Sequence, residues 1–237
     1  LWDLTSGQEV RRFQGHSGVV RAVDLSPDGH VVASGGFAGQ DMLAPGELIL
    51  WDAATGAELR RLTGHTAGIV ALAFTPDGRA LLASSGDAEI FSDRLPVGAA
   101  ENAGLVGITS DMLLWDVATG QVRQRFAPWA EDAFSLAISP DGTQALAGSF
   151  YDKVAVRWDL QSGARLGELA GHSEGVHGVA FSPDGRRALT GSYDDSLMLW
   201  DLASGQRLTV LNGHDSDVLD LAISPDGRTA LSSGRDG

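Results

Sequence analysis

The chain contains the three side-chain types of a hydrolase triad within one short stretch, at His172, Thr190 and Asp194. Such a triad needs a hydroxyl nucleophile, an imidazole base and an orienting carboxylate. The same types return 42 residues later, at His214, Ser232 and Asp236. A catalytic site is needed only once, so this repetition favours a structural role over hydrolysis.

Other groups that could bind a metal ion are also weak candidates. His172 and His177 lie five residues apart, but His172 already belongs to the repeating set. Asp215, Asp217 and Asp220 lack the glycine and the terminal glutamate of a calcium-binding loop, so they are predicted to form a solvated rim. Cysteine is absent, which excludes disulfides, thiol catalysis and Cys–Zn sites. The sequence therefore predicts no metal, no cofactor and no catalytic residue.

The elements that must position these residues repeat along the whole chain. Trp-Asp pairs begin at Trp2, Trp51, Trp115, Trp158 and Trp200. Each is followed after 14 residues by a histidine, and after 11 more by the proline of a Pro-Asp-Gly turn; the exception is Trp129, which replaces the third histidine. The steps between the tryptophans are 49, 64, 43 and 42 residues. A fixed period of this kind indicates a repeat architecture.

Within each period, the local pattern predicts four short β-strands. Apolar runs such as 176–181 and 218–223 are typical of strands buried on both faces. A Pro-Asp-Gly turn follows, then a second strand such as 187–192 and a third such as 196–201 that ends on Trp-Asp. The fourth strand, such as 206–211, alternates as expected for a half-exposed outer edge. No segment of ten residues shows a convincing helical period.

These linked motifs resemble the WD-repeat β-propeller family, and the resemblance covers the whole chain. It implies an all-β propeller of four-stranded antiparallel blades with five repeats, in which four blades are whole and one is split between the termini. Residues 1–237 are then one propeller domain or a segment of one, with insertions at 35–45 and 88–109. Either the termini meet in a five-bladed ring, or the chain is part of a longer, multidomain protein, which we favour. Only one of the 17 basic residues is lysine, an arginine bias that suggests a GC-rich, bacterial genome.

The resemblance also implies a buried tetrad in each blade, with hydrogen bonds running from Asp to His to a hydroxyl to the Trp indole. The best set is His172, Thr190, Asp194 and Trp200, and a second would be His214, Ser232, Asp236 and Trp2 if the ring closes. Such a chain satisfies buried polar groups. The other copies lack one or more members. In the first whole blade Ala38 replaces the aspartate, while His16, Ser34 and Trp51 are kept. In the second, Ala83 replaces the hydroxyl beside His65, Asp87 and Trp115, and the third has Trp129 and Ala147 in place of the histidine and the hydroxyl, with Asp152 and Trp158. Trp129 is interpreted as an apolar plug, with a ligand-stacking platform as the alternative.

Charge narrows the classes of partner. The net charge of −14 disfavours nucleic acid and anionic membranes, and no apolar run is long enough for a spanning helix. Most aspartates occupy turn or tetrad positions, so acidity alone does not prove a cationic partner. We expect a cytoplasmic protein that binds a protein or peptide partner.

The expected function is a non-catalytic scaffold for protein–protein interaction; the alternative is a ligand-binding or enzymatic propeller that uses the central channel. Off-pattern titratable groups are scattered, at His30, His177, Glu89, Glu101 and Glu174. Both insertions fall in turns between second and third strands, which points to that face as the docking face. By family position, the residues expected to face a partner are Arg21, Asp132, Phe134, His177, Tyr193, Asp217, Leu219 and Arg235. Inward packing of Phe134 and Leu219 stays open as an alternative.

Overall fold

The described part of the structure contains β-strands and turns. A computed structural model describes residues 1–39, 45–86, 110–127 and 133–236. No helix occurs in these ranges, so none of them offers a helix that could cross a membrane. The all-β prediction is confirmed.

The strands form four sheets of four strands and one sheet of two, all antiparallel and ordered as they follow one another along the chain. The first sheet contains β1 (Val20–Leu25), β2 (Val31–Gly36), β3 (Glu47–Asp52) and β4 (Glu58–Leu62). The second contains β5 (Gly68–Phe74), β6 (Ala80–Gly86), β7 (Met112–Asp116) and β8 (Val122–Arg125). The third contains β9 (Ala133–Ile138), β10 (Gln144–Ser149), β11 (Val154–Asp159) and β12 (Arg165–Ala170). The fourth contains β13 (Val176–Phe181), β14 (Arg187–Ser192), β15 (Ser196–Asp201) and β16 (Arg207–Asn212). The fifth contains β17 (Val218–Ile223) and β18 (Ala230–Gly234).

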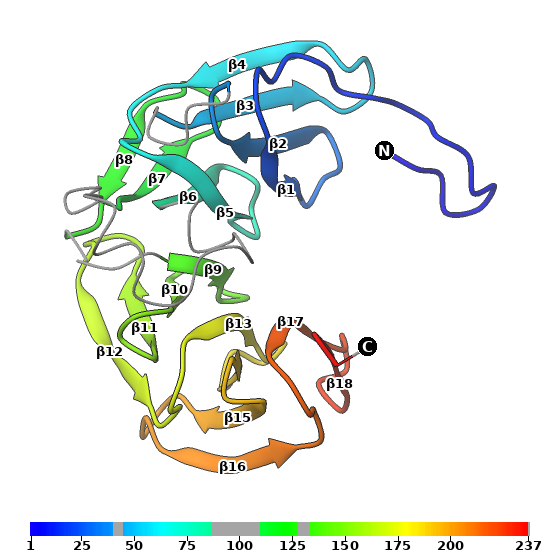
Figure 1. Ribbon diagram of the computed structural model, residues 1–237. Coiled ribbons are helices and arrows are strands. Elements are labelled where there is room, and N and C mark those ends of the chain that lie inside the picture. The colour runs from blue at the N-terminus through cyan, green and yellow to red at the C-terminus, as the bar shows by residue number, and fades with distance from the viewer. Residues whose placement is uncertain (40–44, 87–109, 128–132, 237) are drawn as a thin grey trace.

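The sheets are arranged as blades along an arc, with β4, β12 and β16 on its outer side (Figure 1). The first strands of neighbouring sheets contact one another, in the pairs β1–β5, β5–β9, β9–β13 and β13–β17. The fourth strands are largely exposed, as their alternating pattern predicts. Each sheet thus presents two ends of its strands: one carries the Pro-Asp-Gly turns, and the opposite end carries the histidine loops.

The Pro-Asp-Gly turns fold in the same way along the chain, and the one before β14 illustrates their chemistry. The Ser182 hydroxyl donates to Asp184 Oδ1 at 2.6 Å and accepts from the Arg187 amide at 2.9 Å. Gly185 adopts a φ of 68°, a left-handed conformation that glycine tolerates without steric cost. This turn reverses the chain tightly and sets the register between β13 and β14.

The hydrophobic core lies between sheets, because the faces of neighbouring blades pack against each other. One cluster joins the first and second sheets, another the second and third, and another the third and fourth. The Trp-Asp tryptophans of β3, β7, β11 and β15 are all buried. The tryptophans of β7, β11 and β15 belong to these clusters and are therefore parts of the inter-blade core.

The two ends of the arc differ from the whole blades. Trp2 is 62% exposed, and its backbone bridges to Glu9 rather than pairing with β18. Figure 1 shows the N-terminal segment and the β17–β18 sheet separated by an opening. The alternative of a closed five-bladed ring is therefore not found in the described residues. Gly35 and Gly36, expected in the first insertion, belong instead to β2 and pair with β3.

Candidate functional site: the hydrogen-bond networks and an aromatic surface

The fourth sheet brings together the four side chains of the best predicted tetrad. The Asp194 carboxylate lies 2.9 Å from His172 Nδ1, and His172 Nε2 lies 2.7 Å from the Thr190 hydroxyl. Trp200 Nε1 donates to the same hydroxyl at 2.9 Å. Asp194 also accepts from the Ser173 amide, so it fixes the loop that carries the histidine. The network therefore runs from the loop into the inter-blade core.

The electrostatics of this network favour a neutral imidazole and an ionised carboxylate. Burial lowers the pKa of His172, and the hydrogen bond and charge of Asp194 do not fully offset it. Burial acts to raise the pKa of Asp194, but hydrogen bonds from Ser196, Ser173 and His172 outweigh it and leave the pKa below its usual value. A neutral His172 protonated on Nδ1 donates to Asp194 and accepts the Thr190 proton at Nε2, which satisfies every bond.

In the first sheet, a glutamate replaces the missing aspartate. Glu47 Oε2 lies 3.2 Å from His16 Nδ1 and accepts from the Ser17 amide at 2.8 Å. Ser34 bridges the other side, at 2.7 Å from both His16 Nε2 and Trp51 Nε1. The position of the family aspartate holds Ala38, as the sequence shows, and Glu47 supplies the carboxylate from another position. The substitute is four residues before the tryptophan, whereas the aspartate of the fourth sheet is six residues before it.

The second sheet uses the same shift. Asp111, four residues before Trp115, bonds His65 Nδ1 and accepts from the Thr66 amide at 2.9 Å. Ala83 supplies no hydroxyl, and Trp115 Nε1 donates directly to His65 Nε2 at 3.1 Å. Asp87, to which the sequence assigned the carboxylate role, lies outside the described residues, and Asp111 occupies that role.

The fifth sheet holds a partial network, and the third sheet shows a packing contact of its tryptophan. In the fifth, His214 contacts Asp236 at 2.9 Å and Ser232 at 2.7 Å, but the exposed Trp2 is not brought to them, so this predicted tetrad is not completed. In the third, the Trp158 indole packs edge-on against Phe126 at 5.8 Å between ring centroids. Trp129 lies outside the described residues.

An aromatic surface lies at the histidine-loop end of the third to fifth sheets. We use this name for Phe150, Tyr151, His177 and Tyr193, together with the Arg235–Asp217 ion pair. Phe150 contacts Tyr151 and Tyr193 edge-on, at centroid distances of 5.4 and 5.2 Å, and His177 lies 5.4 Å from Tyr193. The Arg235 guanidinium lies 5.6 Å from the centre of the Tyr193 ring and 3.2 Å from Asp217.

The structure divides the predicted partner-facing residues. It gathers His177, Tyr193, Asp217 and Arg235 into the aromatic surface. Leu219 contributes its backbone carbonyl, which lies 2.6 Å from His177 Nδ1. Phe134 is 6% exposed and its ring stacks on His177. It therefore packs inward beneath the aromatic surface, in agreement with the alternative that the sequence left open.

Two residues predicted to face a partner are not part of the aromatic surface, and two residues of that surface were not predicted. Arg21 lies exposed on β1 of the first sheet, away from the aromatic surface, and Asp132 lies outside the described residues. Phe150 and Tyr151 were missed, although Tyr151 directly precedes Asp152 as Tyr193 precedes Asp194. That repeat position was the signal for finding Tyr151.

Among the off-pattern titratable groups in the described residues, His30 lies apart from His177 and Glu174. His30 follows a Pro-Asp-Gly turn of the first sheet, whereas His177 is at the opposite end of the strands in the fourth. Glu174 pairs with Lys153 at 3.2 Å. Glu89 and Glu101 lie outside the described residues. Within the described ranges, no three His, Asp or Glu side chains form a group that could hold a metal ion.

Repeated four-stranded antiparallel blades, several of them tied by a network from a loop histidine to a buried tryptophan, define a WD-type propeller architecture. A family model described as "WD domain, G-beta repeat" matches residues 7–43, 56–91, 163–201 and 205–237. These matches cover more than half of the chain, so the chain belongs to the WD40 repeat family. They omit residues 92–162, which include the repeat where Trp129 replaces the histidine. Among curated proteins, none gives a significant match.

Proposed function

We propose that the chain is a non-catalytic scaffold that docks a protein or peptide on its aromatic surface. WD40 repeats generally mediate protein–protein interaction and scaffolding. The observation that supports this particular surface is a continuous set of aromatic contacts across two blades, extended to the fifth sheet by Arg235. Tyrosine and arginine are enriched among residues that dominate binding energy at protein interfaces.

The first sheet provides a comparison that separates packing from an exposed surface. Phe37 follows β2 as Phe150 follows β10 and Tyr193 follows β14. Phe37 is 4% exposed and clusters with Val70 of the next blade, so its role is core packing. Phe150 and Tyr193 are half-buried instead, and Tyr151 is 49% exposed. The same repeat position therefore becomes partly accessible in the third and fourth sheets.

A catalytic role for the triad-like residues has little support. Thr190, the hydroxyl that would act as nucleophile, is fully buried and already accepts from the Trp200 indole. A substrate carbonyl would need to reach that oxygen. The equivalent hydroxyls Ser34 and Ser232 contact the histidines of the first and fifth sheets at the same distance of 2.7 Å, so the hydroxyl of the fourth sheet is not singled out.

Photo-crosslinking tests the proposed surface. A photoreactive phenylalanine analogue replaces Tyr151 in one variant and Arg21 in a matched control variant, and the partner crosslinked at each position is identified. We then expect Tyr151→Ala combined with Tyr193→Ala to weaken binding of the identified partner at least tenfold, while Arg21→Ala leaves it within twofold. Circular dichroism checks that each variant is folded.

Equal crosslinking at both positions, or unchanged affinity in the double variant, would overturn the assignment to this surface. Docking on the two insertions expected from the sequence, 35–45 (of which Gly35 and Gly36 belong to β2) and 88–109, stays a separate prediction. A variant in which residues 88–109 are replaced by a short turn distinguishes the two, because only insertion-based docking is lost there.

A further inference from the structure

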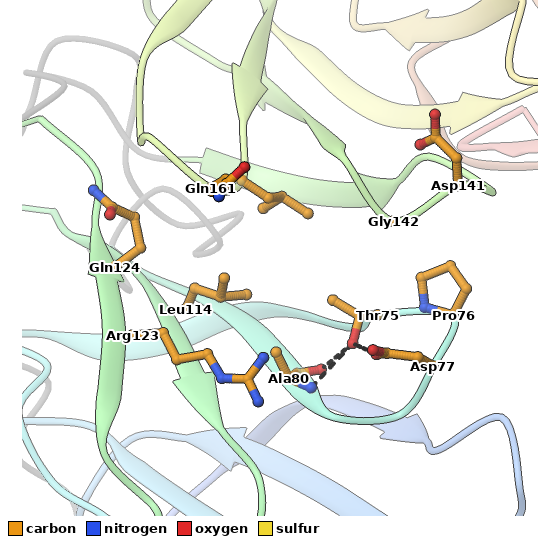
Figure 2. A pocket seen from close by; sticks show the side chains of 11 residues that line it. Thr75, Pro76, Asp77, Ala80, Leu114, Arg123, Gln124, Asp141, Gly142 and Gln161 are labelled. Carbon is orange, nitrogen blue, oxygen red and sulfur yellow. Dashed lines mark hydrogen bonds between the residues drawn. The ribbon is translucent and has the colours of Figure 1, made fainter.

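A cleft opens between the second and third sheets at the end that carries the Pro-Asp-Gly turns, opposite to the aromatic surface. Its volume is about 580 Å³. Figure 2 shows Gln124 on one side and Asp77 and Asp141 on the other, with Leu114, Gln161, Arg123 and Ala80 between them. The cleft thus combines an apolar floor with carboxylates and amides around it.

The cleft lies at a joint that lacks the arginine of the two preceding joints. Arg60, nine residues after Trp51, crosses from the first sheet to the second and donates to the Ala118 carbonyl at 3.0 Å. Arg11 occupies the same repeat position and donates to Thr55 at 3.0 Å. The corresponding residue between the second and third sheets is Gln124. Its side chain is shorter, and Nε2 donates to the carbonyl of its neighbour Arg125 at 2.8 Å.

The glycines of the receiving turns show where the arginine would lie. A Cβ on Gly120 would fall 2.2 Å from Arg60 Cδ, and one on Gly163 would fall 2.2 Å from Gln124 Nε2. Gln124 therefore packs on Gly163 as the aliphatic part of Arg60 packs on Gly120. The side chain of Gln124 is shorter, so it does not reach the place that the guanidinium of Arg60 fills in its own joint.

The joint between the third and fourth sheets is filled by a different arginine. Arg157 crosses it, with Nη1 donating to the Leu202 carbonyl at 2.6 Å and Nη2 to Gln144 Oε1 at 3.1 Å. Leu114 occupies the position of Arg157 before the tryptophan, and Ala80 occupies the position of Gln144 after the turn. The joint between the second and third sheets therefore has smaller side chains at both positions, Leu114 in place of Arg157 and Ala80 in place of Gln144.

The charge of the cleft suits a cation. Asp77 and Asp141 each accept from a turn hydroxyl at 2.6 Å, through Thr75 and Ser139. These bonds, and backbone amides after them, lower the pKa of both carboxyls, so both are ionised at neutral pH. Arg123 also lines the cleft; Asp116 binds it at 2.6 and 2.9 Å, and its charge contributes a smaller part of the lowered pKa of Asp77.

We propose that this cleft binds an arginine side chain presented by an extended segment of a partner protein. The guanidinium donates to Asp77 and Asp141, and its aliphatic stem packs on Leu114 and Leu160. The Gln161 amide and the Gln124 Oε1 face the main chain of the segment, while Gln124 Nε2 keeps its bond to the Arg125 carbonyl. The partner arginine thus enters a joint between sheets, as Arg60 and Arg157 do at the neighbouring joints, but its guanidinium bonds turn carboxylates where theirs bond backbone carbonyls. Planar guanidinium groups favour carboxylates through paired hydrogen bonds, which distinguishes arginine from lysine.

A peptide titration tests the proposal. The probe is acetyl-Ala-Leu-Arg-Leu-Ala-amide, compared with the same peptide carrying citrulline, the uncharged isostere, and the side-chain amide signals of Gln124 and Gln161 are followed by NMR. We expect the arginine peptide to shift both signals and to bind at least tenfold more tightly than the citrulline peptide. Asp77→Asn with Asp141→Asn should weaken binding at least fivefold, whereas Asp184→Asn, at the equivalent turn of the fourth sheet, should leave it unchanged.

Filling the cleft gives a second, independent test. Gln124→Arg restores the residue type of Arg60 and should reduce peptide binding at least tenfold without lowering the melting temperature. Ala80→Val, which restores the residue type of Val31, is a second filling variant that does not change charge. Equal binding of the arginine and citrulline peptides, or unchanged binding in both filling variants, would overturn the proposal. The double variant at Tyr151 and Tyr193 should keep full peptide binding, so failure of either site is distinguishable from failure of the other.

Discussion

Replacing Trp200 by alanine tests whether the repeated network stabilises the inter-blade core. Trp200 is 1% exposed and belongs to the cluster that joins the third and fourth sheets. A buried tryptophan removes about 150–250 Å² from water, which corresponds to about 4–6 kcal/mol at roughly 25 cal/mol per Å². Alanine recovers part of this, and large-to-small core changes of this kind cost about 3–5 kcal/mol. We therefore expect the free energy of unfolding to fall by about 4 kcal/mol, or the melting temperature by roughly 8–16 °C.

Urea unfolding followed by far-ultraviolet circular dichroism measures this loss without depending on tryptophan fluorescence. The matched control is Trp2→Ala, which changes the same repeat position where the side chain is 62% exposed. A surface substitution of this kind should change stability by less than about 0.5 kcal/mol. Equal losses in the two variants, or a negligible loss for Trp200→Ala, would refute the reasoning.

A third variant separates the hydrogen bonds from the core volume. Thr190→Val keeps the shape but removes the hydroxyl that lies 2.9 Å from Trp200 Nε1 and 2.7 Å from His172 Nε2. Leaving buried polar groups without a partner costs about 1–3 kcal/mol. Combined with Trp200→Phe, which removes the indole donor, the losses should be less than additive, because both changes break the same bond. Additive losses would show that the two residues act independently.

Three further predictions follow from the networks and from the buried imidazoles. Burial lowers the pKa of His172 and His177 below the ordinary 6.5, so below that pH the unfolded chain binds protons that the folded chain does not. The free energy of unfolding should therefore be highest above pH 6.5 and fall as the pH drops below it. Urea unfolding measured between pH 7 and 5 would show this fall. Glu47→Gln should lower stability by about 1–2 kcal/mol, because it weakens charged hydrogen bonds to His16 and the Ser17 amide, and thermal unfolding would measure it. Ala83→Ser should not stabilise the second sheet although it restores the family hydroxyl, since the indole there already donates directly to the imidazole; a gain of 1 kcal/mol or more in urea unfolding would contradict this.

The strands were predictable because each carries a local signal that its neighbours do not contradict. The expected strands 176–181, 187–192, 196–201 and 218–223 are observed at those residues. Their apolar pattern, the Pro-Asp-Gly turns and the Trp-Asp ends all favour the same β arrangement. Agreement between local propensity, turn chemistry and burial is the condition under which a sequence specifies its fold.

The site was predictable only where a residue keeps its place relative to the tryptophan. Tyr193 and Arg235 were found because their repeats have the regular spacing. Phe134 was placed on the docking face by position, but its side chain packs inward beneath His177. Position along a strand gives the face of a residue, while the size of neighbouring side chains decides how much of it stays accessible. The cleft between the second and third sheets was missed for a related reason, since it depends on side chains from two repeats.

The shifted carboxylates explain how two blades accept insertions without losing their networks. In the fourth sheet, Ser196 stands four residues before the tryptophan, with its hydroxyl 2.6 Å from Asp194 and 3.4 Å from His172 Nδ1. An acid at that position can therefore reach the imidazole from the start of the third strand, which is where Glu47 and Asp111 are found. A carboxylate in the turn would be displaced when the turn is lengthened, whereas one on the strand is held by the ladder with the second strand. Glu47 is the first residue of β3, and Asp111 directly precedes β7, where its carbonyl accepts from the Ser85 amide. The fourth sheet, with a tight turn, keeps the acid in the turn. The histidine-loop end can thus vary in length and surface while the inter-blade core stays constant, as a docking scaffold requires.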